Sequence, residues 1–181
     1  IEFLAALVIM VDFIPRFGLG HGIFNSFFLA ISAFCNAGFD NLGSSSLQSF
    51  ILNPLINVTI AFLIISGGLG FSVWLDLLKG FKNYLSDKPQ RLSSVVRHLS
   101  NQSRIILYTT GIVLLLGTGI SWFMEFGNAR TIANYNIFQQ LLISFFQTVT
   151  MRTAGFATIN YLDTHTSTNL VYMIQMIIGG A

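Results

Sequence analysis

Two stretches of the chain are apolar over a length suited to a membrane span. Leu55–Leu78 is almost wholly apolar, and Arg104–Phe126 is the second such stretch. At about 1.5 Å per residue, a helix over either stretch would cross a bilayer core about 30 Å thick. Asn53 followed by Pro54 is typical of a helix start. We therefore predict two spanning helices, of which the first ends near Gly80.

Two further apolar stretches are too short to span. As helices, Phe24–Cys35 and Ile137–Thr150 would reach about 20 Å, less than the core of a bilayer. Each is followed by chain that is polar and contains glycine, Asn36–Ser46 in the first case and Met151–Thr168 in the second. Such compositions favour irregular structure. A short apolar helix followed by irregular chain predicts a re-entrant segment in each case.

The two ends of the chain have the pattern of incomplete helices. Ile1–Ile14 is apolar apart from two acidic residues, so we expect the outer end of a helix whose start is missing. Pro15–Gly22 is rich in glycine and proline, which predicts a break. Asn169–Ala181 is expected to begin another span. The polar stretch Gly127–Asn136 is expected outside the membrane.

One sequence phrase occurs twice. Ser32–Phe39 has the sequence SAFCNAGF and Val149–Phe156 has VTMRTAGF, and their glycines are 117 residues apart. The apolar stretches after them also correspond, because Asn57–Gly68 aligns without a gap on Asn169–Gly180 at a spacing of 112. One longer outer loop in the first copy explains the difference. The pattern therefore predicts a duplicated unit of helix, pore loop and helix.

This repeat divides the chain into three predicted parts. Residues 1–80 form a helix–pore-loop–helix unit with a truncated first helix. Residues 81–103 form a basic loop, with a short interfacial helix expected around Leu92–Leu99. Residues 104–181 form a second unit with a truncated last helix. The predicted fold class is an all-α membrane protein, built from repeated helix–re-entrant pore loop–helix units of a potassium-channel-like pore.

The composition and the charge distribution support a multi-pass protein of the cell membrane. Of the 181 residues, 53% are hydrophobic and 9% charged, whereas a soluble domain carries about 25% charged residues. By the positive-inside rule the basic loop is cytoplasmic, and the glycine-containing loops then face outward. The apolar stretches on both sides of this loop argue against a nucleic-acid partner. Six of the nine Lys and Arg residues lie in or beside it: Lys79, Lys82, Lys88, Arg91, Arg97 and Arg104.

The sequence shows no motif typical of an enzyme. Cys35 is the only cysteine, so a disulfide within these residues is impossible and a thiolate metal cluster is not expected. The histidines at 21, 98 and 165 do not have the spacing of metal ligands. We find no activated nucleophile, paired carboxylate or phosphate-binding glycine loop. We therefore expect neither catalysis nor a bound cofactor.

The repeated glycine turns favour ion conduction. Inside a bilayer, irregular backbone persists only where protein buries it or where it lines a watery cavity. Glycine accepts a positive φ and lets the backbone approach an ion closely. Rings of backbone carbonyls can replace the hydration shell of a cation. The C-terminal end of each short helix carries the negative end of the helix dipole, which also favours a cation. The candidate filter residues are Asn36, Ala37, Gly38, Phe39, Thr153, Ala154, Gly155 and Phe156.

These motifs resemble those of a known family, the Trk/Ktr/HKT superfamily of potassium transporters. Ala30–Phe39 resembles the second pore loop of its Ktr-type membrane subunits, and Phe146–Phe156, with its string Arg-Thr-Ala-Gly-Phe, resembles the third. The resemblance covers nearly the whole chain. Cys35 stands where asparagine is common and Met151 where proline is common, which bears on conduction rate more than on ion choice.

The resemblance implies a function and partners. It implies potassium uptake across the plasma membrane through a filter of four loops, of which this chain would supply the second and third. It also implies a homodimer, cytosolic nucleotide-binding regulatory subunits, and sodium as a candidate coupling ion. A sodium transporter, a secondary transporter with broken helices and a non-conducting scaffold are the alternatives. Two re-entrant loops in the same order favour the pore.

Four residues near the glycine turns have two interpretations each. Arg152 is expected to support the filter as a tether, and the alternative is a snorkelling surface charge. Asp40 could attract cations at the outer mouth or be an exposed turn residue. Gly179 and Gly180 could belong to a gate or pack between helices, as small residues do in membranes.

Overall fold

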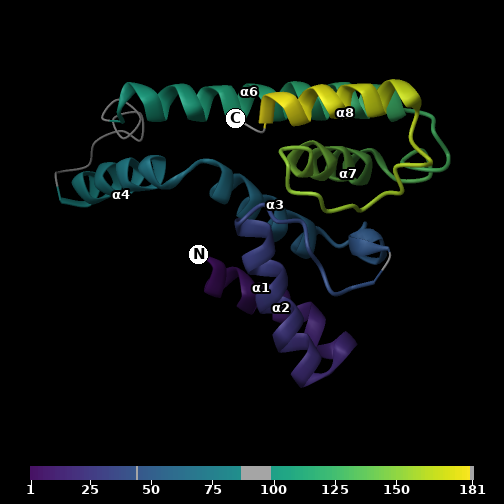
Figure 1. The fold of residues 1–181 in the computed structure, drawn as a ribbon, viewed down its shortest axis with the longest axis horizontal. Coiled ribbons are helices and arrows are strands. Elements are labelled where there is room, and N and C mark those ends of the chain that lie inside the picture. Colours follow the sequence, from purple (N-terminus) through teal and green to yellow (C-terminus); the bar gives the residue numbers. More distant parts are fainter. Residues whose placement is uncertain (44, 87–98, 180–181) are drawn as a thin grey trace. The chain divides into compact units, whose positions relative to one another are not determined.

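The computed structural model describes residues 1–43, 45–86 and 99–179, and most of them are helical. Within these ranges no strand is found, so the predicted all-α class is confirmed. The elements are α1 (Glu2–Phe17), α2 (Leu19–Phe34), the 3-10 helix η1 (Ser46–Phe50), α3 (Pro54–Gly68), α4 (Phe71–Ser86), α6 (Asn101–Glu125), α7 (Ile137–Thr150) and α8 (Thr166–Gly179) (Figure 1).

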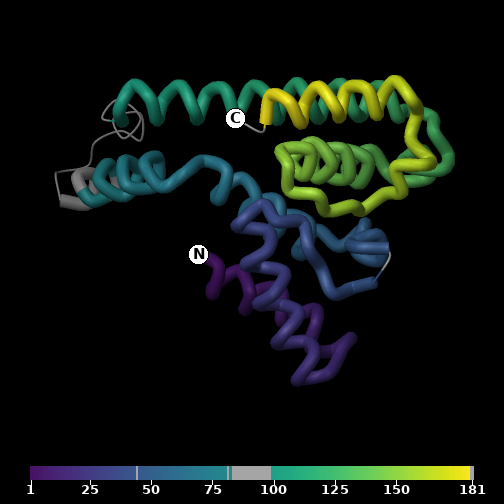
Figure 2. The backbone as a smooth tube through the Cα atoms, viewed as in Figure 1, coloured from purple at the N-terminus to yellow at the C-terminus, as the bar shows by residue number. Residues whose placement is uncertain are grey.

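The chain forms two compact units, whose backbone can be followed in Figure 2. One unit combines Ile1–Gly68 with Leu114–Ala181, and the other is Leu69–Val113. The first unit therefore contains both copies of the repeated phrase. The division into residues 1–80, 81–103 and 104–181 rests on the sequence repeat and stays a prediction.

The core of the first unit draws on both copies of the repeat. Helix α1 packs against α2 and α3, and α3 packs against both α2 and α7. A single cluster joins Phe13 of α1, Leu29 of α2, Ile60 of α3 and Phe146 of α7, each at most 2% exposed. Phe156, from the second glycine loop, is fully buried in the same cluster. The second glycine loop is thus anchored in the main hydrophobic core.

The break between α1 and α2 is shorter than the predicted Pro15–Gly22. Helix α1 continues through Pro15 to Phe17, and α2 begins at Leu19. Gly18, with φ +78°, makes the turn by itself. Pro15 lies in the last turn of α1, where its missing N–H weakens the end of the helix without interrupting it. Even with its earlier start, the 16-residue α2 is only about 24 Å long and still too short to span.

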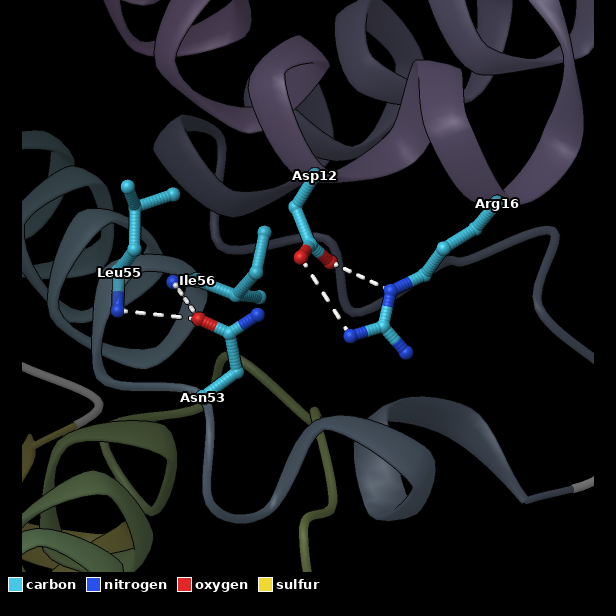
Figure 3. A network of polar contacts seen from close by, with 5 residues as sticks. All are labelled: Asp12, Arg16, Asn53, Leu55 and Ile56. Carbon is cyan, nitrogen blue, oxygen red and sulfur yellow. Dashed lines mark hydrogen bonds and ion pairs between the residues drawn. The ribbon is translucent and has the colours of Figure 1, made fainter.

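The predicted start of α3 is confirmed. The Asn53 side-chain oxygen accepts hydrogen bonds from the backbone N–H groups of Leu55 at 3.1 Å and Ile56 at 3.3 Å (Figure 3). These are two of the donors that a helix leaves unpaired at its N-terminus. Figure 3 also shows the ion pair at the end of α1, in which Arg16 Nε lies 3.0 Å from a carboxylate oxygen of Asp12.

The prediction of one continuous helix over Leu55–Leu78 is wrong. Helix α3 ends at Gly68, Gly70 adopts φ +80°, and a new helix begins at Phe71. Glycine weakens helices and accepts a positive φ, so the glycine cluster at 67–70 ends α3. The new helix continues past Gly80, the predicted stop, to Ser86.

Helix α6 is the one described helix that is long and apolar enough to cross a membrane alone. It starts at Asn101 and so includes nearly all of the predicted span Arg104–Phe126. The pair Pro54–Gly68 and Phe71–Gly80 would count as a second span if the two helices form a broken one. The remaining apolar helices in the described ranges are shorter than a bilayer core requires.

The second unit joins α4 to the beginning of α6 through one carboxylate. Asp76 accepts hydrogen bonds from the hydroxyl groups of Ser100 and Ser103, both at 2.6 Å. The Ser100 hydroxyl also accepts a bond from the Ser103 N–H, which caps α6. The predicted short helix at Leu92–Leu99 lies, except for Leu99, outside the described residues.

In the first unit, the C-terminal half of α6 packs closely against α8 and α7. A Cβ atom added to Gly117 would lie 2.5 Å from the amide nitrogen of Gln175 on α8 and 2.5 Å from a methyl carbon of Thr148 on α7. The bounds predicted for α7 are confirmed to the residue, whereas α8 begins three residues before the predicted Asn169. Gly117 therefore has a packing role.

Gly67 should be a stability-determining position. A Cβ atom at this residue would overlap the carbonyl oxygen of Phe34 at the end of α2. We expect Gly67→Ala to destabilise the protein by roughly 2 kcal/mol, as overpacking in a close contact does. Thermal unfolding in detergent measures the effect. Gly119→Ala is the matched control, since nothing lies within 4 Å of its added Cβ, and equal melting temperatures of the two variants would contradict the packing.

Candidate functional site

The two repeated glycines meet face to face. Gly38 follows α2 and Gly155 follows α7. A Cβ atom built on Gly38 would lie 3.1 Å from the Cα of Gly155 and would overlap the carbonyl oxygen of Ala154, and one built on Gly155 would lie 3.4 Å from the Cα of Gly38. The two loops are therefore neighbours through their backbones, and at Gly38 this approach leaves no room for a side chain.

The same backbone conformation occurs in both loops. Asn36 has φ +51° and Gly38 has φ +72°, and at the equivalent positions Thr153 has φ +69° and Gly155 has φ +84°. A left-handed conformation is rare for residues other than glycine, and it is least favourable for a β-branched residue such as threonine. The duplication predicted from the sequence is thus reproduced in the local geometry.

Each short helix ends in a turn that produces this conformation. The N–H groups of Asn36 and Ala37 donate back to the carbonyls of Ala33 at 3.2 Å and Ser32 at 2.9 Å. This is the pattern of a Schellman motif with asparagine in the left-handed position. After α7, the N–H groups of two residues converge on a single carbonyl, that of Thr150: Ala154 at 3.0 Å and Gly155 at 3.4 Å.

The second loop alternates between core and surface. Ala154 and Phe156 are 0% exposed, whereas Thr153 and Gly155 are exposed. Burial of alternate residues anchors one side of the loop and leaves the other side accessible. Phe39, the counterpart of Phe156 in the first loop, is 69% exposed instead. The two phenylalanines of the repeat therefore have different environments.

The loop residues fall into two groups, according to whether a hydrogen bond to their backbone carbonyl is found. Phe156 accepts a hydrogen bond from the Thr150 hydroxyl at 2.8 Å, and Ala157 accepts one from the N–H of Leu47 at 3.0 Å. Among the described residues, we find no hydrogen bond that ends on the carbonyls of the other candidate filter residues: Asn36, Ala37, Gly38, Phe39, Thr153, Ala154 and Gly155. Such carbonyls are the groups with which a protein can coordinate a dehydrated cation.

A polar network around the Phe156 carbonyl was not predicted from the sequence. The Tyr161 hydroxyl lies 3.1 Å from the side-chain oxygen of Gln147 and 3.3 Å from the Phe156 carbonyl. The Gln147 amide donates to Thr158 at 3.2 Å. Burial, with the neighbouring Tyr172, raises the pKa of Tyr161, so its hydroxyl stays protonated and available as a donor. The one sequence feature that pointed to this network was Gln147, a polar residue in a mainly apolar stretch.

Arg152 lies beside the last residues of both α3 and α8. A Cβ atom on Gly68 would lie 3.6 Å from Arg152 Nη2 and 3.5 Å from Asn36 Nδ2, and one on Gly179 would lie 3.0 Å from the Arg152 Cα. Arg152 Nη1 and Asn36 Oδ1 are both buried, without a hydrogen-bond partner among the described residues. Arg152 is half-buried. It faces the C-terminal end of α3, where a helix dipole favours a positive charge.

Asp40 is engaged in its own turn. One carboxylate oxygen accepts a bond from the N–H of Leu42 at 3.1 Å, and the other accepts one from the Ser46 hydroxyl at 2.6 Å. The turn is therefore present, whereas attraction of cations at the outer mouth stays a prediction. Gly180 lies outside the described residues, and Gly179 lies in the close contact with Arg152.

Glu125 is a buried carboxylate whose partners the sequence did not indicate. It lies at the end of α6 and is 2% exposed. It accepts hydrogen bonds from Thr131 at 2.6 Å, Asn128 at 2.7 Å and the N–H of His165 at 2.9 Å. It thus fastens the segment before α8 to the C-terminal end of α6. An acidic residue at a helix end offered no signal for these partners.

These features define an all-helical membrane protein with two packed glycine loops. A family model described as TrkH, Cation transport protein, matches residues 1–181. The chain therefore belongs to the TrkH family of cation transport proteins.

Similar proteins of known name agree with this assignment. The chain is 33% identical over 181 residues to Ktr system potassium uptake protein B of Bacillus subtilis, covering 99% of this chain and 37% of that protein. It is 36% identical over 180 residues to the potassium/sodium uptake protein NtpJ of Enterococcus hirae, again covering 99% and 37%. The low-affinity potassium transport protein of Saccharomyces cerevisiae is 29% identical over 164 residues, which cover 83% of this chain and 18% of that protein. The chain thus spans little more than a third of the length of the first two relatives.

Asn36 should tolerate glycine better than alanine. Its φ of +51° costs about 1 kcal/mol for an ordinary L-residue, less for asparagine and nothing for glycine. We expect Asn36→Ala to lower the unfolding free energy by about 1 kcal/mol and Asn36→Gly to leave it nearly unchanged. Thermal or denaturant unfolding in detergent measures both. If both variants lost the same unfolding free energy, the stabilising effect of Asn36 would come from its side-chain amide and not from its backbone conformation.

Proposed function

We propose that this chain forms part of a pore for potassium uptake, in which the two glycine loops supply half of a filter of backbone carbonyls. The observation that carries the proposal is the set of carbonyls at 36–39 and 153–155 without a hydrogen bond among the described residues. Unpaired carbonyls inside a membrane are costly unless a cavity or an ion compensates them. A monovalent cation that loses its hydration shell is a fitting ligand.

Exposure supports the same assignment. Thr153 and Gly155 are exposed while their neighbours Ala154 and Phe156 are buried, so one side of the loop can line an ion path. The Phe156 carbonyl is already bonded to Thr150. In the proposed filter Phe156 therefore anchors the loop in the core, and the carbonyls of Thr153–Gly155 are the ones that coordinate the ion.

We propose potassium as the transported ion because two of the similar proteins are named for potassium transport. The proteins from Bacillus subtilis and Saccharomyces cerevisiae are a potassium uptake protein and a potassium transport protein. The relative from Enterococcus hirae is a potassium/sodium uptake protein, so sodium transport is the second candidate function. Sodium would act either as an alternative substrate or as a coupling ion.

The complete assembly is part of the proposal. By its resemblance to Trk/Ktr/HKT transporters, the chain would share its central filter with two further loops of the same polypeptide. The name "Ktr system" of one relative is consistent with a membrane subunit that works in a complex. We propose a homodimer in the cell membrane with cytosolic nucleotide-binding regulatory subunits, and with the glycine loops facing outward.

Arg152 is proposed to support the filter loops from the side of α3. Its guanidinium and the side-chain amide of Asn36, from the first loop, both lie close to Gly68 at the end of α3. A half-buried charge at this place is a functional candidate in a membrane protein. Since the planar guanidinium can reach two partners at once, it is suited to hold both loops together.

The filter glycines should control ion selectivity. In the intact protein we expect Gly38→Ser and Gly155→Ser to reduce the ratio of potassium to sodium transport, because a Cβ at a positive-φ turn redirects the neighbouring carbonyls. Gly38→Ser should have the larger effect, since its Cβ would overlap the Ala154 carbonyl, whereas that of Gly155 has one contact, at 3.4 Å. Rubidium and sodium fluxes into proteoliposomes measure the ratio. Unchanged selectivity in both variants, at normal expression, would refute the assignment.

Arg152 should require both its charge and its shape. Arg152→Lys keeps the charge but loses the bidentate geometry, and Arg152→Gln loses the charge. A tether predicts that both variants lower potassium uptake and thermal stability, with lysine giving only partial rescue. Full activity of the lysine variant with failure of the glutamine variant would indicate a purely electrostatic role. Parent-like behaviour of both would remove Arg152 from the site.

The proposed topology places two exposed residues on opposite sides of the membrane. In a Cys35→Ser background, Lys82→Cys should react with an impermeant thiol reagent from the cytoplasm, and Asn134→Cys should react from outside, as the positive-inside rule predicts. Both side chains are exposed in the structure. Mass-tag labelling of intact cells and of inverted vesicles measures this accessibility. Reaction of both cysteines from the same side would contradict the topology.

A further inference from the structure

The two glycine loops are joined at a second place, beyond the glycines. Asp40 follows Gly38 by two residues, and Ala157 follows Gly155 by two. The Ser46 hydroxyl donates to the Asp40 carboxylate at 2.6 Å, and the same oxygen accepts the Ala157 N–H at 3.5 Å. The N–H of Leu47 donates to the Ala157 carbonyl at 3.0 Å. Both polar backbone groups of Ala157 are therefore held by the first copy of the repeat.

Ser46 adopts a backbone conformation that needs support. Its φ is +48°, in the left-handed region that a serine occupies at a cost of about 1 kcal/mol. Such conformations persist where the surrounding contacts determine them, and they are concentrated at functional sites. Here the supporting contacts are the bond to Asp40 and the pairing of the next residue, Leu47, with Ala157.

We propose that Asp40 and Ser46 are positioning residues that set the spacing between the two filter loops and thereby the ion selectivity of the pore. This inference rests on the proposed function of the glycine loops. Discrimination between cations depends on the size of the cavity that the carbonyls form, or on the number and field strength of the carbonyls that coordinate the ion, and a shift of one loop against the other changes both. The contact between Gly38 and Gly155 fixes the loops at one point, and the Asp40–Ser46–Ala157 connection fixes them at a second, which removes the freedom to pivot about the first.

This role differs from attraction of cations at the mouth. Both oxygens of the Asp40 carboxylate already accept hydrogen bonds, from Leu42 and from Ser46. An attracting charge acts through its field and does not require the Ser46 hydroxyl. A positioning role requires it, because the hydroxyl is the link from Asp40 to Ala157. Substitution of Ser46, which carries no charge, therefore separates the two explanations.

The test compares substitutions of Ser46 in the intact protein reconstituted in proteoliposomes. Ser46→Ala removes the hydroxyl, and Ser46→Gly removes it while also relieving the left-handed backbone, which keeps the test informative if the alanine variant folds poorly. We expect both to reduce the ratio of rubidium to sodium flux by about fivefold, equivalent to one hydrogen bond. Asp40→Asn should reduce it in the same direction. Ser49→Ala, an exposed serine of the same 3-10 helix, is the matched control and should leave the ratio unchanged.

Two outcomes would overturn the proposal. Parent-like selectivity in Ser46→Gly would exclude the Ser46 hydroxyl as a link between Asp40 and Ala157. If Asp40→Asn then lowered only the rubidium flux at low rubidium concentration, Asp40 would act by its charge. Gly38→Ser, measured in parallel, distinguishes this failure from failure of the proposed function. If Gly38→Ser alters selectivity while Ser46→Gly does not, the filter stands and the positioning role falls. If Ser46→Gly, Gly38→Ser and Gly155→Ser all leave selectivity unchanged, the filter assignment itself falls.

Discussion

The contact between the backbones of Gly38 and Gly155 is the constraint on which the rest of the first unit depends. A loop with unpaired carbonyls gains little stability from its own hydrogen bonds, so it must be held by its surroundings. Here each loop leaves the end of a short helix and meets the other at a glycine. A side chain at Gly38 would overlap the partner loop. The turns that end α2 and α7, the burial of Phe156 and the bonds to Ala157 all serve to maintain this contact.

The two glycine loops have similar sequences and backbone conformations, but their side chains make different contacts. Both loops share the left-handed residues at 36 and 38 and at 153 and 155. They differ at the phenylalanine after the second of these residues, since Phe156 enters the core whereas Phe39 is exposed. The first loop has a further connection to the second through Asp40 and η1. Equivalent backbones are thus stabilised by different side chains, which fits the proposal that the filter uses only the backbone.

Much of this arrangement could be predicted from local sequence. The bounds of α7 and the cap of α3 follow from composition and from Asn53, and the repeated phrase predicted the paired turns. The prediction failed where local signals conflict. Pro15 suggested a break but lies in the last turn of α1, and the apolar run from Leu55 concealed a break at Gly70. Contacts between distant residues, such as Ser46 with Ala157 across 111 positions and Glu125 with His165 across 40, leave no periodic pattern to detect.

The most direct test of the account is to locate the ion. Crystals of the intact protein soaked with thallium or rubidium, which scatter anomalously and substitute for potassium, would show where a monovalent cation binds. We expect an anomalous peak within coordination distance of the loop carbonyls at 36–39 and 153–155. A peak elsewhere in the protein, with none beside Gly38 and Gly155 at saturating ion concentration, would contradict it.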